Sequence, residues 1–467
     1  MDAQLSPKLT ISTNLKGFKH SISLCCMKTT LSVYESGKLK INVPFGQILW
    51  CETSLNDTFN LSLLRKQHEK KLVLFTVSGS FAATFRQEAS RLVEFVMEKA
   101  YGDSPRQRRF KVLVNPKGGP GTAGRIFGTK VKAMFEAAHC PIDVVFTQYS
   151  RHGYEILKNI NLGDYDGIAV LSGDGLVHEV FNGLADHENS ALALEMPVIP
   201  LPAGSANGFS VALLGPEEGL DVGAAVLNAI KGKKMKIDLC SITQNNKRSI
   251  SFLSQTVGLM ADLDLGTEHL RWMGDARFVA GYFWGVILNK THDVTLEIKT
   301  NVRDKQDMVK TYKSFKSSKS LTDSSFSTNG NDEEVTEEWI TIEKPVGYIY
   351  AGKIPFVSKD FMQFPLALCD DGFIDVVLQE RLSRLGWLKN MDGADKGKQY
   401  WLSSQHYYKA RAYRLIPHTP HGYCSVDGER FQYAPFEVEV LPRLGTTFGH
   451  GAWAADKFYE DAPKNNR

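Results

Sequence analysis

The chain has few cysteines and no long uninterrupted apolar run. Its seven cysteines are scattered over 467 residues without a CxxC pair, so the sequence indicates neither a zinc site nor a dithiol redox motif. No apolar run reaches the roughly 18 residues of a membrane helix, and the first residues, MDAQLSPKLT, lack the core of a signal peptide. We therefore expect reduced cysteines in a cytoplasmic protein, and only peripheral contact with membranes.

The chain also carries little net charge. The 55 Lys and Arg residues almost balance the 52 Asp and Glu residues, for a net charge of +3. Bulk electrostatics therefore give no reason to expect a nucleic acid or an acidic partner. A composition of 43% hydrophobic and 23% charged residues is typical of a globular protein, and the length predicts two or three domains.

The segment 167–184, GIAVLSGDGLVHEVFNGL, predicts a buried strand, a glycine-flanked acid and a helix. Gly173 and Gly175 lack the Cβ atoms that would keep a phosphate from the backbone, and the N-terminal amides of the helix point to the same place. Asp174 lies between these glycines. It either caps the helix or serves a metal ion or a reacting hydroxyl, and the segment by itself leaves both roles open.

Two further strand ends carry similar turns. Residues 110–114 precede NPKGGPG, and residues 197–201 precede PAGSANG. The first turn lacks the GK[ST] ending of a P-loop. A strand over 142–147 ends at Thr147, which we expect at the same edge. Because ligands bind at the carboxyl ends of parallel strands, these turns together predict a phosphate site in an α/β domain.

Residues 1–105 read as a β-rich domain closed by a helix over 88–101, which resembles the pleckstrin-homology fold. The basic segment 65–71 in this domain could meet lipid phosphates or form a solvated loop, and we favour the loop. Residues 102–109 read as a polar linker.

The motifs VNPKGGPGTA, LSGDGLVHEVFNGL and LPAGSANGF resemble, in order and spacing, those of the diacylglycerol kinase catalytic superfamily. The form SGDGLxHEVxNGL is most similar to sphingosine kinases, the kinases of sphingoid long-chain bases. The resemblance covers residues 110 to about 300 and returns between 346 and 442. It implies a three-layer α/β nucleotide-binding domain with a mostly parallel sheet, followed by a β-sandwich.

We accordingly expect four parts: the N-terminal domain 1–105, the α/β domain 106–240, the β-sandwich domain 241–445 and a tail over 446–467. The segment 303–338 is rich in Ser, Lys and acids, and we expect a disordered insertion there. The tail is expected to be unstructured from about Gly445.

The run 261–278, ADLDLGTEHLRWMGDARF, places three acids close to two arginines, which can simply neutralise one another on a helix surface. The resemblance instead implies that Asp264 binds the sphingoid headgroup, that Ser254 contacts it and that Glu268 braces the site. It further implies that Arg271 and Arg277 reach the nucleotide phosphates.

Two motifs follow towards the C-terminus. PLALCDDGFIDVVLQ is similar to the family's PxAxxDDGxxDVV motif, where Asp370-Asp371-Gly372 reads as a tight turn, although relatives use nearby acids for a structural metal. YCSVDGERF resembles the family's DGE motif. The motif could be only a hairpin turn. Because the other kinase-like motifs are present, we favour a turn that carries Asp427 and Glu429 to the nucleotide.

The resemblance thus implies an ATP- and Mg²⁺-dependent lipid kinase that phosphorylates a sphingoid base such as sphingosine, dihydrosphingosine or phytosphingosine. Asp174 is the expected catalytic residue and the expected metal ligand. The residues expected to bind the nucleotide are Asn115, Lys117, Gly118, Gly119, Thr147, Ser172, Gly173, Gly175, Glu179, Ser205, Arg271, Arg277, Asp427 and Glu429.

The alternatives are a ceramide or diacylglycerol acceptor, a relative that phosphorylates NAD, and a lipid-binding module with an inactive kinase site. The segments LRWMGDAR and SVDGE speak against the NAD kinase. The expected partners are the lipid substrate and the cytoplasmic surface of an intracellular or plasma membrane, through peripheral contact. A homodimer is compatible with the sequence.

Overall fold

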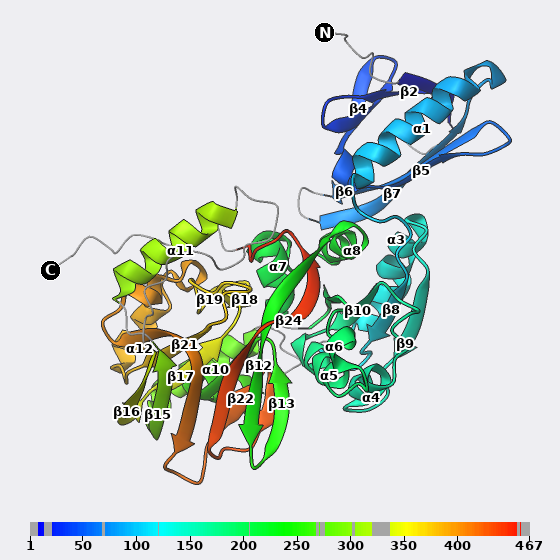
Figure 1. Ribbon diagram of the computed structural model, residues 1–467. Helices are drawn as coiled ribbons and strands as arrows, with labels where there is room; N and C mark the ends of the chain where they lie inside the picture. The colour runs from blue at the N-terminus through cyan, green and yellow to red at the C-terminus, as the bar shows by residue number, and fades with distance from the viewer. Residues whose placement is uncertain are drawn as a thin grey trace.

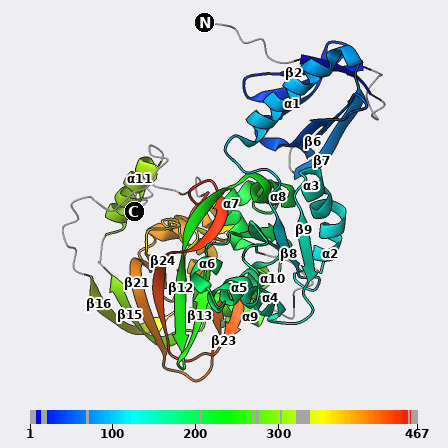
Figure 2. The ribbon, with the colours of Figure 1, turned by 45° about the vertical axis from the view of Figure 1, so that its right-hand side comes forward.

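This computed structural model describes residues 8–13, 21–67, 71–119, 121–204, 206–267, 270, 276–300, 304–319, 337–454 and 458. Figure 1 shows three parts along the chain: an N-terminal lobe, a central α/β domain, and a C-terminal domain built on a large curled sheet. The two larger parts lie side by side, and the N-terminal lobe projects from the α/β domain (Figure 2).

The α/β domain is organised around a four-stranded parallel sheet with the order β11-β10-β8-β9. Its strands are β8 (Phe110–Val114), β9 (Ile142–Phe146), β10 (Gly167–Ser172) and β11 (Val198–Pro202). Its helices are α2 (Ala123–Ile126), α3 (Lys132–Ala137), α4 (His152–Lys158), α5 (Asp174–Ala185), α6 (Ser190–Ala193), α7 (Gly208–Glu218) and α8 (Val222–Lys231), with a π-helical turn at Phe127–Val131 between α2 and α3.

Strand β10 is buried along its whole length. Ile168 and Val170 pack into the cluster that includes side chains of α4 and α5, whereas Ala169 and Leu171 pack into the cluster that includes side chains of α3 and α8. A strand covered on both faces needs apolar residues at every position rather than at alternate ones. This confirms the three-layer domain with a buried central strand.

The N-terminal lobe is an antiparallel sheet of seven strands in the order β4-β3-β2-β1-β7-β6-β5, followed by one helix. The elements are β1 (Lys8–Ser12), β2 (Ser21–Cys26), β3 (Thr30–Glu35), β4 (Lys38–Pro44), β5 (Ile48–Thr53), β6 (Thr58–Gln67), β7 (Lys71–Ser80) and α1 (Arg86–Tyr101). Helix α1 buries Leu92 and Val96 against this sheet. The β-rich character is as expected, and the likeness to the pleckstrin-homology fold stays a prediction.

The end of the β6–β7 hairpin contacts the α/β domain. The N–H of Leu72 donates to Asp221 Oδ2 at 2.7 Å, and Lys66 Nζ lies 3.1 Å from Glu218 Oε1. The basic segment 65–71 is therefore not only a solvated loop, because Lys66 pairs across the seam between two domains. His68 and Lys70 lie outside the described residues.

The C-terminal domain contains an eleven-stranded sheet, whose main path runs β13-β12-β24-β21-β20-β17-β14-β22-β23 while β15 joins β16 to β21. Its strands are β12 (Lys233–Gln244), β13 (Lys247–Ser251), β14 (Ser254–Gly258), β15 (His292–Thr300), β16 (Glu338–Val346), β17 (Tyr348–Gly352), β20 (Ile374–Gln379), β21 (Gln405–Pro417), β22 (Cys424–Val426), β23 (Glu429–Phe431) and β24 (Phe436–Gly449). The short strands β18 (Phe356–Ser358) and β19 (Phe361–Met362) pair separately.

Helices α9 (Leu259–Gly266) and α10 (Ala276–Leu288) lie in the chain between β14 and β15, and α12 (Arg384–Asn390) follows β20. The curled sheet fits the expected sandwich-like domain. Strand β12 follows α8 directly and pairs with β24 near the C-terminal end of the chain.

The expectation of a disordered insertion over 303–338 is wrong for its first half. Residues Lys305–Lys319 form helix α11. Met308, Val309 and Tyr312 are buried in an apolar cluster with side chains of α9, α10 and α12. Three apolar residues at helical spacing are enough to pack this helix against the apolar cluster. The prediction missed them because most other residues of the segment are polar or charged.

The expectation of an unstructured tail from Gly445 is also wrong. Strand β24 continues to Gly449, where it pairs with Lys233 of β12. Beyond it, the indole N–H of Trp453 donates to the carbonyl oxygen of Lys353 at 3.0 Å. The small and polar residues after Gly445 gave no sign of a strand in the sequence. In the structure the side chains of Thr447 and Phe448 in this strand are buried.

Candidate active site

Three glycine turns meet at the carboxyl edge of the parallel sheet. A Cβ atom on Gly119 would lie 2.8 Å from Cα of Gly204, and one on Gly204 would lie 2.5 Å from Cα of Gly173. These separations are too short for any larger residue, so the backbones of the three turns approach each other as only glycine permits. The expectation that the turns form a single edge site agrees with this geometry.

The first turn, after β8, is held by its own asparagine. Asn115 Oδ1 accepts from the N–H of Lys117 at 3.1 Å, and the N–H of Asn115 donates to the carbonyl of Leu171 at 3.1 Å. A Cβ atom on Gly118 would lie 3.1 Å from Ser172 Oγ. The ammonium of Lys117 is on an exposed residue, so the turn offers a cation and convergent N–H groups to an anion.

Asp174 is the first residue of α5 and lies among these turns. Its carboxylate accepts from the N–H of Gly208 at 2.8 Å and from the N–H of Phe209 at 3.3 Å, both at the start of α7. Burial raises the pKa of this carboxyl to about 6, against the lowering effect of the two N–H donors, and the charges of Asp427 and Asp264 raise it further. A carboxylate with such a pKa is suited to accept a proton near neutral pH.

Asp264 of helix α9 approaches from the C-terminal domain. Its Oδ2 accepts from Ser425 Oγ at 2.5 Å, and it influences Asp174 electrostatically. Arg277 of α10 donates to the backbone carbonyl of Asp264 at 3.2 Å, and its guanidinium lies 3.9 Å from Asp264 Oδ1. The structure thus brings Arg277 to the Asp264 carboxylate, and contact of Arg277 with phosphates stays a prediction.

The DGE hairpin lies between the two domains. A Cβ atom on Gly175 would lie 2.2 Å from Glu429 Oε1, so Glu429 is packed directly against the glycine-flanked acid turn. A Cβ atom on Gly428 would lie 4.0 Å from Asp264 Oδ2. The hairpin is therefore close both to Asp264 and to the turn at Gly175. Contact of Glu429 with the nucleotide stays a prediction.

Asp427, by contrast, is buried and engaged on both oxygens. The carboxylate accepts from Ser251 Oγ at 2.6 Å and from the N–H groups of 252–254 at 2.9 to 3.2 Å. Its Oδ2 also lies 2.8 Å from Nδ1 of His178. These donors surround the carboxylate, so the Asp427 side chain supports the turn and links the two domains. Contact of Asp427 with the nucleotide stays a prediction.

A family model described as the diacylglycerol kinase catalytic domain matches residues 109–242. The sphingoid long chain base kinase 4 of Schizosaccharomyces pombe is 32% identical over 411 residues, which cover 87% of this chain and 88% of that protein. The chain belongs to the sphingoid long-chain base kinase family.

Other comparisons agree with this membership. The sphingoid long chain base kinase 5 of Saccharomyces cerevisiae is 30% identical, over 81% of this chain and 64% of that protein. The sphingosine kinase 1 of Arabidopsis thaliana is 31% identical, over 67% of this chain and 65% of that protein. A solved structure from Bacillus anthracis, provisionally described as a diacylglycerol kinase, superposes with a TM-score of 0.51 at 17% identity and covers 74% of this chain and 95% of its own. This last likeness shows the fold alone.

Two residues of this candidate site have no role in the sequence-based assignment. Asn207 adopts a left-handed backbone with φ of 49°. Its Nδ2 donates to the carbonyl of Ser172 at 2.8 Å, and its Oδ1 accepts from the N–H of Gly204 at 2.9 Å. Asn207 therefore ties two of the glycine turns together. The sequence offers one indication of this role: an asparagine inside a glycine-rich turn, because asparagine tolerates the left-handed conformation better than most residues.

His178 is the second such residue. It follows Asp174 by four positions on α5, so the two side chains share one face of the helix. The motif GDGLVHEV contains it, but the partner in the hairpin is 249 residues away in sequence. A contact between residues so far apart in the sequence leaves no pattern in the residues around either of them.

Glu179 and Thr147 are placed around the turn after β9. The Glu179 carboxylate accepts from the N–H groups of Arg151 and Gly153, each at 2.9 Å, so it fixes the turn that begins α4. Thr147 is buried, and its Oγ1 donates to the carbonyl of Val114 at 3.4 Å. Both residues support the edge of the sheet, and direct contact with the nucleotide stays a prediction for each.

Ser254 lies at the seam of the two domains. It is buried, its N–H donates to Asp427 Oδ1 at 2.9 Å, and its hydroxyl shares a hydrogen bond with Tyr350. Ser205, Glu268 and Arg271 lie outside the described residues.

Proposed function

We propose that this chain transfers the γ-phosphoryl group of ATP to the primary hydroxyl of a sphingoid long-chain base. The observation that carries the proposal is the carboxylate of Asp174, which lies where three glycine turns meet and has a pKa raised to about 6. The names of the relatives in Schizosaccharomyces pombe and Arabidopsis thaliana support the same acceptor class.

The nucleotide phosphates are assigned to the glycine turns. Convergent backbone N–H groups bind phosphate oxygens, and Lys117 adds a positive charge. The residues assigned to this role are Asn115, Lys117, Gly118, Gly119, Ser172, Gly173, Gly175, Ser205, Arg271, Arg277 and Glu429. Thr147 and Glu179 hold the neighbouring turn in place.

The chemical step requires little covalent work from the protein. The lipid hydroxyl oxygen forms a bond to the γ-phosphorus as the bond from that phosphorus to the β-γ bridging oxygen breaks, and ADP leaves. The hydroxyl proton passes to the Asp174 carboxylate, whose two N–H donors from α7 hold it in place. Cationic side chains of this chain offset the charge that develops on the phosphoryl oxygens.

A magnesium ion fits the residues present. Among the described residues no cluster of three or more His, Cys, Asp or Glu side chains forms a metal site. Magnesium in kinases is held by one or two carboxylates together with substrate phosphates, so such a cluster is not required. Asp174 is the residue that would hold it, and the ion when bound would neutralise phosphate charge.

Asp264 is assigned to the ammonium group of the sphingoid base. A carboxylate beside the acceptor hydroxyl forms a charge-assisted hydrogen bond with an ammonium, which the amide of ceramide and the esters of diacylglycerol do not offer. Asp264 comes from a different domain than Asp174, and its charge is felt at Asp174. The amino group and the reacting hydroxyl can therefore be bound from two sides.

The surface of α10 and α12 is assigned to the membrane. Phe283, Trp284, Ile287 and Leu288 of α10 are exposed, as are Leu385 and Leu388 of α12. The guanidinium of Arg384 donates to the carbonyl of Ile287, so the two helices form one surface. No helix among the described residues is both long and apolar enough to cross a bilayer. A lipid kinase needs access to acceptor molecules in a leaflet, and a cluster of exposed apolar side chains supplies peripheral attachment.

The test is an assay with radiolabelled ATP and a panel of sphingosine, dihydrosphingosine, phytosphingosine, ceramide and diacylglycerol. We expect label in the three sphingoid bases, and its loss in Asp264→Ala. Preferred labelling of ceramide or diacylglycerol would overturn the acceptor assignment. Failure to label any lipid, with binding retained, would indicate a lipid-binding module without kinase activity.

A further inference from the structure

Tyr350 of strand β17 lies on the same face of the C-terminal sheet as the residue that holds Asp264. Its register partner in β14 is Thr256, and the partner of Thr256 in β22 is Ser425. Directly paired residues of antiparallel strands point their side chains to one face of the sheet. Ser425 Oγ donates to Asp264 Oδ2 at 2.5 Å. Tyr350 and the carboxylate that we assign to the sphingoid ammonium therefore lie on one side of the sheet.

The ring of Tyr350 contacts apolar side chains. It packs against the apolar cluster that contains side chains of α9, α10, α11 and α12. Its centroid lies 5.3 Å from that of Phe364, in an edge-on arrangement. Its partner on the other neighbouring strand, β20, is Val377, which belongs to the same cluster. Because Tyr350 keeps some accessible surface, its ring forms a border of the apolar region that a ligand can reach.

The hydroxyl of Tyr350 lies among polar groups. Burial raises the pKa of this phenol, and the nearby charges of Asp264, Asp174 and Asp427 raise it further. A hydrogen bond with Ser254 acts in the opposite direction. A protonated phenol has one donor and also accepts, so it can serve Ser254 and one further hydroxyl at the same time. Tyr350 thus joins an apolar ring to a hydrogen-bonding group close to the charges of the kinase site.

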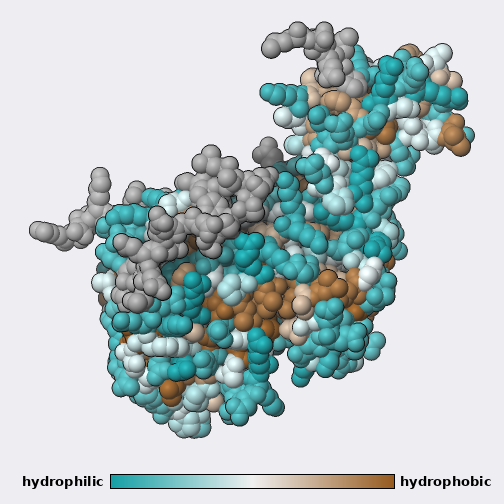
Figure 3. Space-filling model, in the orientation of Figure 1, coloured by the Kyte–Doolittle hydropathy of each residue, from teal (hydrophilic) through white to brown (hydrophobic). Residues whose placement is uncertain are grey.

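The two larger domains hold Asp174 and Tyr350 in a fixed relation. Phe209, whose N–H donates to Asp174 at 3.3 Å, packs its ring against Phe252 of the C-terminal domain, with the ring centroids 5.2 Å apart. Figure 3 shows apolar residues gathered in the region where β12 meets the α/β domain. Close packing between the domains keeps the distance from the Asp174 carboxylate to the Tyr350 hydroxyl constant.

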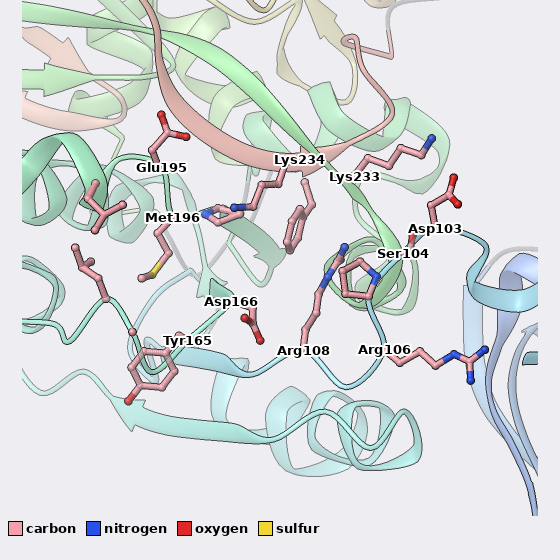
Figure 4. Close-up of a pocket in the computed structure, with 16 residues that line it drawn as sticks. Asp103, Ser104, Arg106, Arg108, Tyr165, Asp166, Glu195, Met196, Lys233 and Lys234 are labelled. Atoms are coloured by element: carbon pink, nitrogen blue, oxygen red, sulfur yellow. The ribbon is translucent and has the colours of Figure 1, made fainter. Parts of the chain in front are cut away.

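A cavity at the opposite edge of the parallel sheet takes no part in this site. Its volume is about 840 Å³, and its walls include residues that precede the amino-terminal ends of β8, β10 and β11 (Figure 4). Its buried cation, Arg108, donates to the carbonyl oxygens of residues 229, 230 and 232. The guanidinium therefore supports the end of α8. The acceptor headgroup belongs to the carboxyl ends of the strands, where Asp174 lies.

Strands β14 and β17 lead from the domain seam into the apolar cluster. Ser254, at the seam, pairs with Gly352. Two residues further along, Thr256 pairs with Tyr350, and the last pair on this face includes Tyr348, which is buried in the cluster. Successive residues on one face of a strand are about 6.6 Å apart. Tyr350 therefore lies one step beyond Ser254 in the direction of the apolar cluster.

We propose that Tyr350 binds the hydroxyl group on C4 of phytosphingosine and so makes this base the preferred acceptor. The inference rests on the function proposed above and adds a substrate preference to it. In a sphingoid base the reacting hydroxyl is on C1, the ammonium on C2 and a second hydroxyl on C3. Asp174 and Asp264 are assigned to the first two, and Ser254 is the next hydrogen-bonding residue towards the apolar cluster.

The order of these residues matches the order of groups along the lipid. Of the three bases named above, only phytosphingosine carries a hydroxyl on C4, where the apolar chain begins. Tyr350 supplies a hydroxyl at the corresponding place, after Ser254 and before the buried part of the cluster. A C4 hydroxyl that met only apolar side chains would lose its hydrogen bonds to water without replacement. The phenol of Tyr350 offers that replacement.

The test compares phytosphingosine with dihydrosphingosine, which differs from it only by lacking the C4 hydroxyl. Both bases are presented to the full chain in the same detergent micelles, and binding and phosphorylation are measured separately. Tyr350→Phe removes the phenolic oxygen and keeps the ring. Tyr348→Phe is the matched control, because it removes a hydroxyl from the same strand and face, one that donates to Gln363 Oε1 at 3.3 Å.

We expect the parent and Tyr348→Phe to bind phytosphingosine roughly tenfold more tightly than dihydrosphingosine, as one hydrogen bond allows. Tyr350→Phe should bind the two bases about equally, with a raised KM for phytosphingosine and an unchanged KM for ATP. A merely structural role would weaken both bases together.

Equal affinity of the parent for the two bases would refute the proposal without any variant. So would the same preference for phytosphingosine in Tyr350→Phe as in the parent, or an equal loss of that preference in Tyr348→Phe. A parent that shows the expected preference in binding but phosphorylates neither base would overturn the proposed kinase activity and leave the role of Tyr350 standing. A parent that binds neither base would overturn both.

Discussion

Nδ1 of His178 lies 2.8 Å from Oδ2 of Asp427, and this contact joins α5 of the α/β domain to the hairpin turn of the C-terminal domain. One turn further along α5, Asn182 exchanges two hydrogen bonds of 2.8 Å with the backbone of Ile250. The helix that begins with Asp174 is therefore fastened to the second domain at two successive turns. Asp174 and the C-terminal domain are therefore held in one arrangement, because both are fastened to helix α5.

The His178–Asp427 contact should contribute measurably to stability. His178→Ala removes a partner of a buried carboxylate, and we expect a loss of about 3 kcal/mol in the free energy of unfolding. Burial lowers the pKa of His178, but the hydrogen bond and charge of Asp427 outweigh it, so the pKa is raised in the folded chain. The contact should therefore contribute its full stabilisation below the pKa that His178 has in the unfolded chain. This stabilisation should be lost as the pH rises through the pKa of His178 in the folded chain.

Urea denaturation of parent, His178→Ala, Asp427→Asn and the double variant measures this coupling at several pH values. His421→Ala, at an exposed position, is the control and should change stability by less than about 0.5 kcal/mol. Additive effects of the two substitutions at low pH would show that the contact contributes nothing.

Asp174→Asn should abolish turnover without unfolding the chain. The amide retains an oxygen for the N–H of Gly208 or Phe209 but cannot take a proton from the acceptor hydroxyl. We expect kcat to fall by about 10² to 10⁴. Asp164→Asn, at an exposed turn before β10, is the matched control. Activity of Asp174→Asn within a few fold of the parent would remove Asp174 from the mechanism.

Asn207 offers a test of how the glycine turns are held. Asn207→Gly keeps the left-handed backbone but loses the hydrogen bonds to Ser172 and Gly204, which should cost about 2 kcal/mol of unfolding free energy. Asn207→Ala loses the same bonds and adds about 1 kcal/mol of backbone strain at its φ of 49°. Both variants should raise the KM for ATP. Equal stability of the two variants would show that the backbone conformation adds no cost.

Lys231 predicts a pH-dependent attachment of the N-terminal lobe. Its ammonium donates to the carbonyls of Phe45, Ile48 and Ala100 in that lobe, and burial lowers the pKa of Lys231 to about 7. Between this value and the unfolded pKa near 10.4, the unfolded chain binds one more proton, so stability should rise with pH.

The comparison with Lys231→Met isolates this effect, because other titrating groups cancel. The difference in unfolding free energy, parent minus variant, should increase by up to about 1.4 kcal/mol per pH unit between pH 7 and pH 10. A difference that stays constant over this range would show that Lys231 keeps its proton in the folded chain.

We expect the exposed apolar side chains of α10 to determine how tightly the protein binds lipid vesicles. Phe283 and Trp284 are 47% and 63% exposed, so replacing both with Ser should change stability little. Each large apolar side chain that enters a membrane contributes roughly 1.5 to 3 kcal/mol, so affinity for vesicles should fall by about 100-fold or more. Leu55→Ser, in the N-terminal lobe and 97% exposed, is the control. Unchanged co-sedimentation of the α10 variant would place the membrane contact elsewhere.

The sequence predicted the secondary structure around Asp174 well because its signals are local. A buried strand, a glycine-flanked acid and a helix follow one another within residues 167–184, and the structure places β10, the turn at Asp174 and α5 there. The same applies to the turns at Gly119 and Gly204. The sequence-based prediction was wrong at α11, where three buried residues lie in a polar segment. It was also wrong at β24, where the residues around Gly445 suggested an unstructured tail.

The sequence by itself determined the family of the chain and the place of its glycine turns, because each turn is specified by neighbouring residues that suit one backbone conformation. Only the tertiary structure decided what Asp427 and His178 do, since their contact joins positions 249 residues apart. It also decided where Arg108 lies, at a cavity whose walls come from separate segments of the chain. Such arrangements depend on how domains pack, and no local pattern records them.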